Sequence, residues 1–138
     1  MVRRTNPPTA AAVPSLGAAV SGPALPGVPE GVPAEQVPTQ SLGTVTVRGA
    51  LFTEVLSDDV LTARAKPAEG EDEQAAAVRA TVEKTVRTLA RQVLGADGLP
   101  LKTYAEWQVF GVRHRDEALH LFNVASRLNS SAEDAEKN

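Results

Sequence analysis

The chain has 138 residues, 4% aromatic content, no cysteine and a formal net charge of −3. This length predicts one domain, and the lack of cysteine excludes disulfides, thiolate catalysis and cysteine-based zinc sites. The small negative charge argues against binding of nucleic acid or anionic lipid through charge alone.

The first 42 residues contain eight of the ten prolines, with Ala, Gly, Val, Ser and Thr between them. Proline lacks an amide donor and restricts the residue before it, so this stretch predicts a disordered arm over residues 1–42. The arm is either an inert linker or a peptide that lies along a partner.

The prolines of the arm also interrupt any apolar helix after Arg3-Arg4, so we expect no secretory signal and a cytoplasmic location. No apolar run approaches the length that crosses a bilayer, and we expect no membrane contact.

Order is expected to begin at Gly43. Residues 44–48 are mostly β-branched and lie between Gly43 and Gly49, which predicts a strand. Residues 50–52 could continue this strand after a bulge or turn at Gly49.

A helix is expected over residues 53–64, ended by Pro67 and Gly70. Its apolar residues predict a buried side made of Val55, Leu56, Val60 and Ala63.

The strongest helical pattern covers residues 73–94. Its expected apolar stripe consists of Val78, Val82, Val86, Leu89 and Val93. Acidic residues just before this helix suit the positive end of its dipole better than they suit a metal site. Gly95 is expected to cap the helix, and residues 96–100 predict a turn.

Thr103 and Glu106 have the spacing of a capping box, which predicts a short helix over residues 103–110. A last helix is expected over 113–128, and a disordered polar tail over 130–138. The buried stripe of this last helix should hold Ala118, Leu121, Phe122, Ala125 and Leu128. The sequence therefore predicts a mainly α domain over 43–129, a small helical unit with a short N-terminal β-strand or hairpin.

Catalytic signals are weak. His114 and His120 are six residues apart and point in different directions on a helix, so they cannot share a metal. Ser126 and Ser130 lack a nucleophile elbow, and no phosphate-binding glycine motif is present. We expect no enzyme activity, no metal and no cofactor.

A helix-turn-helix is an alternative, because Arg113-His114-Arg115 opens the last helix. Asp116 and Glu117 follow at once and would face phosphates, so we expect no nucleic acid partner.

The order of segments resembles the small tail assembly chaperones of long-tailed bacteriophages. The resemblance rests on Val45–Arg48 as the opening strand, the loop Ala96–Leu101 and the closing helix Ala118–Asn129. It covers about Thr44 to Asn129. The proline-rich arm departs from the family pattern, as does Asn129-Ser130-Ser131, where a glycine often follows.

The resemblance implies a non-enzymatic chaperone that binds the tape measure protein and assists tail tube assembly. It implies a protein in the host cytoplasm and absent from the mature virion. A structural phage adaptor retained in the virion is the alternative. The partner surface is expected on the last two helices, although the same side chains could instead fill the core: Tyr104, Trp107, Phe110, Leu121 and Phe122.

Overall fold

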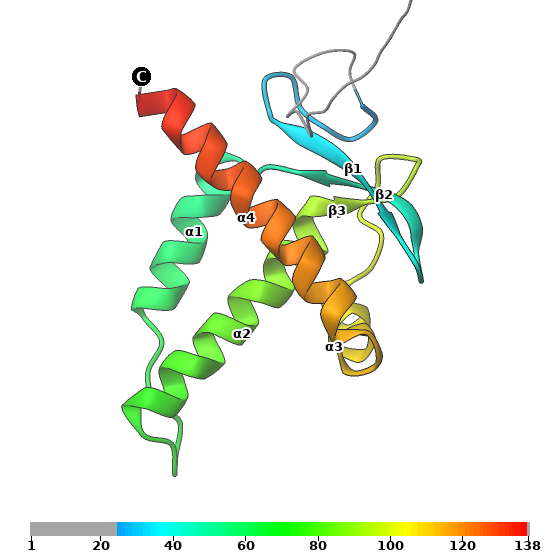
Figure 1. Cartoon of the computed structure of the whole chain (residues 1–138). Coiled ribbons are helices and arrows are strands. Elements are labelled where there is room, and N and C mark those ends of the chain that lie inside the picture. Colours follow the sequence, from blue (N-terminus) through cyan, green and yellow to red (C-terminus); the bar gives the residue numbers. More distant parts are fainter. Residues whose placement is uncertain (1–24, 138) are drawn as a thin grey trace, which may run out of the picture.

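The computed structural model describes residues 25–137 as four helices and a small three-stranded antiparallel sheet (Figure 1). The expectation of a mainly helical domain is therefore met in part, because the sheet is larger than the single strand or hairpin expected. The elements in chain order are β1 (Ala34–Thr39), β2 (Gly43–Arg48), α1 (Phe52–Ala63), α2 (Glu73–Gln92), β3 (Val93–Leu94), α3 (Tyr104–Arg113) and α4 (Arg115–Lys137). Residues 1–24 of the expected arm lie outside the described part.

The sheet has the order β1-β2-β3, and β2 confirms the strand predicted at 44–48. Strand β1 corrects the prediction that all of residues 1–42 are disordered, because it pairs with β2 from Ala34↔Arg48 to Thr39↔Gly43. Proline is compatible with β1 for a geometric reason. The amide of Gly49 donates to the Pro33 carbonyl (2.7 Å), and hydrogen-bonded pairs alternate along an antiparallel ladder. Pro38 therefore falls at a position whose amide would face away from β2, on an edge strand where proline is tolerated.

Helix α1 begins at Phe52, so residues 50–52 do not continue the strand. Leu51 is extended, and its amide donates to Oε1 of Glu54 (2.8 Å), which satisfies a free donor at the helix start. Helix α2 begins where it was predicted, and its N-cap Asp72 accepts from the Ala75 amide (2.7 Å). The last two residues of the helix predicted over 73–94 instead form β3, which pairs with β2.

The predicted turn after β3 is present, with Gly98 at φ +82° and the Gly95 amide donating to the Leu99 carbonyl. The predicted capping box of Thr103 and Glu106 is also confirmed at the start of α3. Helix α3 continues past Gly111 to Arg113. Helix α4 runs to Lys137, which corrects the prediction of a disordered tail over 130–138. Residues 130–137 contain neither Gly nor Pro and include Ala, Glu and Lys, so nothing interrupts the helix.

The core lies between the sheet, the C-terminal half of α2, α3 and α4. Helix α4 crosses in front of α2 and reaches the sheet (Figure 1). Its predicted stripe is confirmed, with Ala118, Leu121, Ala125 and Leu128 buried and Phe122 partly buried against the core. No helix of the described residues is both long enough and apolar enough to span a membrane.

Candidate protein-interaction site on helix α1

Helix α1 buries a carboxylate and exposes most of its large apolar side chains, whereas the predicted Val55 is half-buried. Asp58 is its buried residue, whereas Phe52, Leu56 and Val60 are 63%, 46% and 45% exposed. Ala63 is exposed as well, so the prediction that Leu56, Val60 and Ala63 lie on the buried side of this helix is wrong. Phe52, Leu56 and Val60 recur every four positions and share one side of the helix, which we call the α1 stripe. Asp58 is two positions from Leu56 and from Val60, so it lies on the opposite side.

Ion pairs explain why α1 has this orientation. Asp58 accepts from Nε of Arg87 (3.0 Å) and from a terminal nitrogen of Arg91 (2.7 Å), both on α2. Glu54 accepts two hydrogen bonds from the guanidinium of Arg48 on β2, at 3.0 and 2.9 Å. Arg91 also lies 3.7 Å from Glu54, so it joins the two carboxylates. We call these five residues the latch.

Burial alone would raise the pKa of Asp58, but hydrogen bonds and charge from Arg91 and Arg87 outweigh it and hold that pKa below its usual value. Burial would also raise the pKa of Glu54, but Arg48 and the Leu51 amide outweigh it, so this pKa is lowered too. A carboxylate held ionised in this way is a weak proton acceptor. Asp58 is therefore suited to fixing α1 in place and poorly suited to general-base catalysis.

A half-open cleft of about 290 Å³ lies between α1, α2 and α4. Asp58 and Lys84 face it together with the partly buried ring of Phe122 and several hydroxyl groups. The lining residues are Val55, Asp58, Asp59, Lys84, Thr88, Phe122, Ser126, Asn129 and Ser130. The buried carboxylate of the cleft, Asp58, is already paired with two arginines. The cleft therefore presents the other polar groups of its lining, beside the hairpin formed by α1 and α2.

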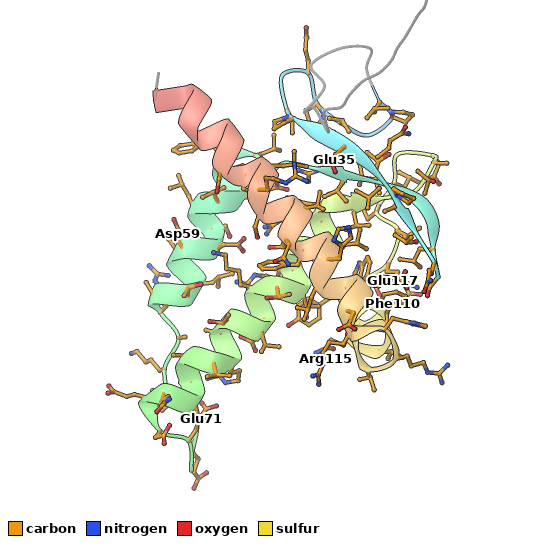
Figure 2. All side chains as sticks on the ribbon, in the orientation of Figure 1. Glu35, Asp59, Glu71, Phe110, Arg115 and Glu117 are labelled. Atoms are coloured by element: carbon orange, nitrogen blue, oxygen red, sulfur yellow. The ribbon has the colours of Figure 1, made fainter. Side chains whose placement is uncertain are left out.

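Ser41, His114 and Glu117 have the residue types of a catalytic triad, but their bonding differs. The Ser41 hydroxyl donates to Glu117 (2.7 Å), and its oxygen is 3.3 Å from Nδ1 of His114. The Ser41 amide also donates to Glu117 (3.0 Å). Figure 2 shows Glu117 at the start of α4, beside the turn of the β1–β2 hairpin. The hydrogen bond from Ser41 lowers the pKa of Glu117, so the group serves to fasten the hairpin to α4.

The structure places three of the five predicted partner-binding residues in the core. Trp107, Phe110 and Leu121 are 1%, 8% and 0% exposed, and the rings of Trp107 and Phe110 pack edge to face with centroids 5.3 Å apart. A partner cannot contact these side chains in this conformation, so the alternative of core packing describes them. Tyr104 and Phe122 are partly exposed. Of these two, Phe122 lines the cleft beside α1.

Two further sequence hypotheses lose their geometric basis. Only His114 separates α3 from α4, whereas a helix-turn-helix joins its helices through three or four residues. Val78 and Val82, expected in the buried stripe of α2, are more than half exposed, because the N-terminal half of that helix buries the side that carries Ala76 and Ala80 instead. Within the described residues, no group of three or more His, Cys, Asp or Glu side chains could hold a metal ion.

No protein-family model, no curated protein and no solved structure matches this chain.

Proposed function

We propose that this protein is a non-enzymatic chaperone domain that binds an amphipathic helix of another protein along the α1 stripe. The observation that carries the proposal is the exposure of Phe52, Leu56 and Val60 at positions i, i+4 and i+8. This spacing is the one through which helices dock into apolar partner surfaces. Single exposed apolar residues are common on soluble proteins, but three in register on one short helix form a contiguous surface.

The partner we propose is the tape measure protein of a long-tailed phage, whose long helices need cover before the tail tube forms around them. The support is the sequence resemblance to tail assembly chaperones, which rests on the β2 strand, the turn before α3 and the first half of α4. On this proposal the protein acts in the host cytoplasm with tail tube subunits and is absent from the mature virion.

The proposed surface differs from the one expected from sequence. Trp107 and Phe110 stabilise the body of the domain, and α1 presents the partner-binding side chains in their place. The latch holds α1 with its apolar side outward, so the stripe is available without rearrangement of the core.

Co-expression with a tape measure fragment tests the proposal. The double variant Leu56→Gln/Val60→Gln should abolish co-purification, because it removes apolar area from the stripe without touching the core. Val112→Gln is the matched control, since Val112 lies on α3 and is 84% exposed. Unchanged co-purification of the double variant, or equal loss with the control, would contradict the proposed surface.

Mass spectrometry of purified particles tests the chaperone role itself. A chaperone should be absent from mature virions, whereas an adaptor would be present in a fixed ratio to other tail proteins. Stoichiometric recovery of this chain from mature particles would replace the chaperone by the adaptor.

A further inference from the structure

We propose that α1 is a hinged helix, held to the body by the latch, that opens as a unit while the rest of the fold stays closed. This inference concerns how the helix is held and does not depend on which partner binds it.

The core takes no side chain from α1. Among the described residues, the buried apolar cluster and the partly buried residues packed on it come from β1, β2, the loops, α2, β3, α3 and α4. Every other helix contributes apolar side chains to this cluster. Opening α1 would uncover only small apolar side chains, the buried Ala76 and Ala80 of α2 and the half-buried Val55, so the latch supplies a large part of the free energy that opposes opening.

The two carboxylates by which α1 is held, Glu54 and Asp58, are neutralised by arginines of the latch. Glu54 faces Arg48 of β2 and Arg91 of α2, and Asp58 faces Arg87 and Arg91 of α2. Lys84 of α2 and Asp59 of α1 line the cleft beside Asp58, and α4 brings only the uncharged Ser126, Asn129 and Ser130 to it. If Glu54 and Asp58 lose their charges, three neighbouring guanidinium groups are left unpaired and repel one another.

Both connections of α1 are fixed to other elements. The Ala50 amide donates to Oδ1 of Asn129 on α4 (2.7 Å), which holds the chain just before the helix. After the helix, Arg79 of α2 donates to the Lys66 carbonyl (2.9 Å) and to Glu71. Gly70, at φ +79° with open space around it, lies in that second connection. Opening would rotate α1 about the line that joins these two fixed points. The cleft beside α1 shows that α4 does not pack closely against this helix.

Acid titration of the full chain, read with two probes, tests the inference. Trp107 is the only tryptophan and is buried in the core, so its emission reports on the core and not on α1. Far-UV circular dichroism should lose part of its helical signal as the pH falls, before the emission of Trp107 shifts. Coincident changes of the two signals would mean that α1 and the core open together, and would overturn the inference.

Hydrogen exchange at pH 7 gives the second test. The variant Glu54→Gln/Asp58→Asn removes both latch charges and should raise exchange in peptides from residues 52–63 by at least about tenfold, with peptides from 118–128 unchanged. Glu35→Gln is the control, because it removes the ion pair of Glu35 with Arg127 (3.0 Å), which joins β1 to α4 and involves neither α1 nor its connections. Equal acceleration in both regions, a shifted Trp107 emission at pH 7, or no acceleration at all would overturn the inference. None of these readouts involves a partner, so a failure of the proposed chaperone function would leave them unaffected.

Discussion

Gly27 and Gly98 meet backbone to backbone, although they are far apart in the sequence. Both have positive φ angles, and a Cβ atom on Gly27 would overlap the Gly98 carbonyl, while one on Gly98 would lie 2.5 Å from the Pro26 carbonyl carbon. This contact joins the segment before β1 to the turn between β3 and α3. It gives the chain around Pro26 and Gly27 a defined position ahead of β1 and β2.

Gly98→Ala should lower the free energy of unfolding by about 2–5 kcal/mol. A left-handed backbone costs an alanine about 1–2 kcal/mol, and forcing a methyl group into occupied space costs about 1–3 kcal/mol more. Gly31→Ala is the matched control, because Gly31 has φ +85° and a Cβ atom there would have no other atom within 4 Å. Urea unfolding followed by Trp107 emission measures both. Equal losses for the two variants would show that the close contact contributes nothing.

Local signals in the sequence predict the helices and β2. The capping pair Thr103 and Glu106, the Asp-Gly turn and the β-branched run at 44–48 each act over a few residues, so one chain segment contains all the information that specifies them. Strand β1 has no such signal. Its formation depends on pairing with β2 across the hairpin and on Pro38 lying where an amide would point away from β2. The end of α4 is equally hard to predict, because its polar composition suits a solvated helix and a disordered tail alike.

The candidate site was harder to predict than the fold. Periodicity identifies Leu56 and Val60 as sharing one side of a helix, but it does not say whether that side faces the core. The answer depends on Asp58, whose partners Arg87 and Arg91 come from another helix. The contact of Ser41 with Glu117 is likewise long in sequence and has no local signal. An acidic residue opposite an apolar stripe on one helix, with arginines four residues apart on the next helix, is the sequence pattern that could have indicated the orientation.

Asn129→Ala should lower the free energy of unfolding by about 1–3 kcal/mol, the cost of leaving buried polar groups without partners. The Asn129 side-chain oxygen accepts from the Ala50 amide (2.7 Å) and from Nε2 of the fully buried Gln92 (3.1 Å). Asn123→Ala removes the same side chain from an exposed position on α4 and should change stability by less than about 0.5 kcal/mol. Urea midpoints compare the two. If Asn129→Ala is as mild as the control, water replaces the lost contacts.

Trp107→Ala should lower the free energy of unfolding by about 3–5 kcal/mol, because it leaves a large cavity among core residues. Tyr104→Ala should cost clearly less, since Tyr104 is partly exposed at the start of the same helix. Thermal unfolding followed by far-UV circular dichroism measures both variants without relying on the tryptophan. A folded Trp107→Ala variant with near-normal stability would contradict its placement in the core and restore it as a candidate for partner contact.

Stability should fall as the pH is lowered, and the latch should account for much of the loss. Glu54 and Asp58 have folded-state pKa values below their ordinary values of 4.5 and 3.8. The unfolded chain therefore binds protons at a higher pH than the folded chain does. Each carboxylate thus stabilises the fold at neutral pH, and its contribution disappears as the pH falls through the folded-state pKa.

Urea midpoints at pH 7, 5 and 3 should fall steeply below about pH 4.5 for the wild-type chain. Glu54→Gln/Asp58→Asn should start lower at pH 7 and show a flatter dependence, because it loses two carboxylates with lowered pKa values, while Glu71, Glu106 and Glu117, whose pKa values are also lowered, still contribute. Parallel curves for variant and wild type would mean that the acid sensitivity arises outside the latch.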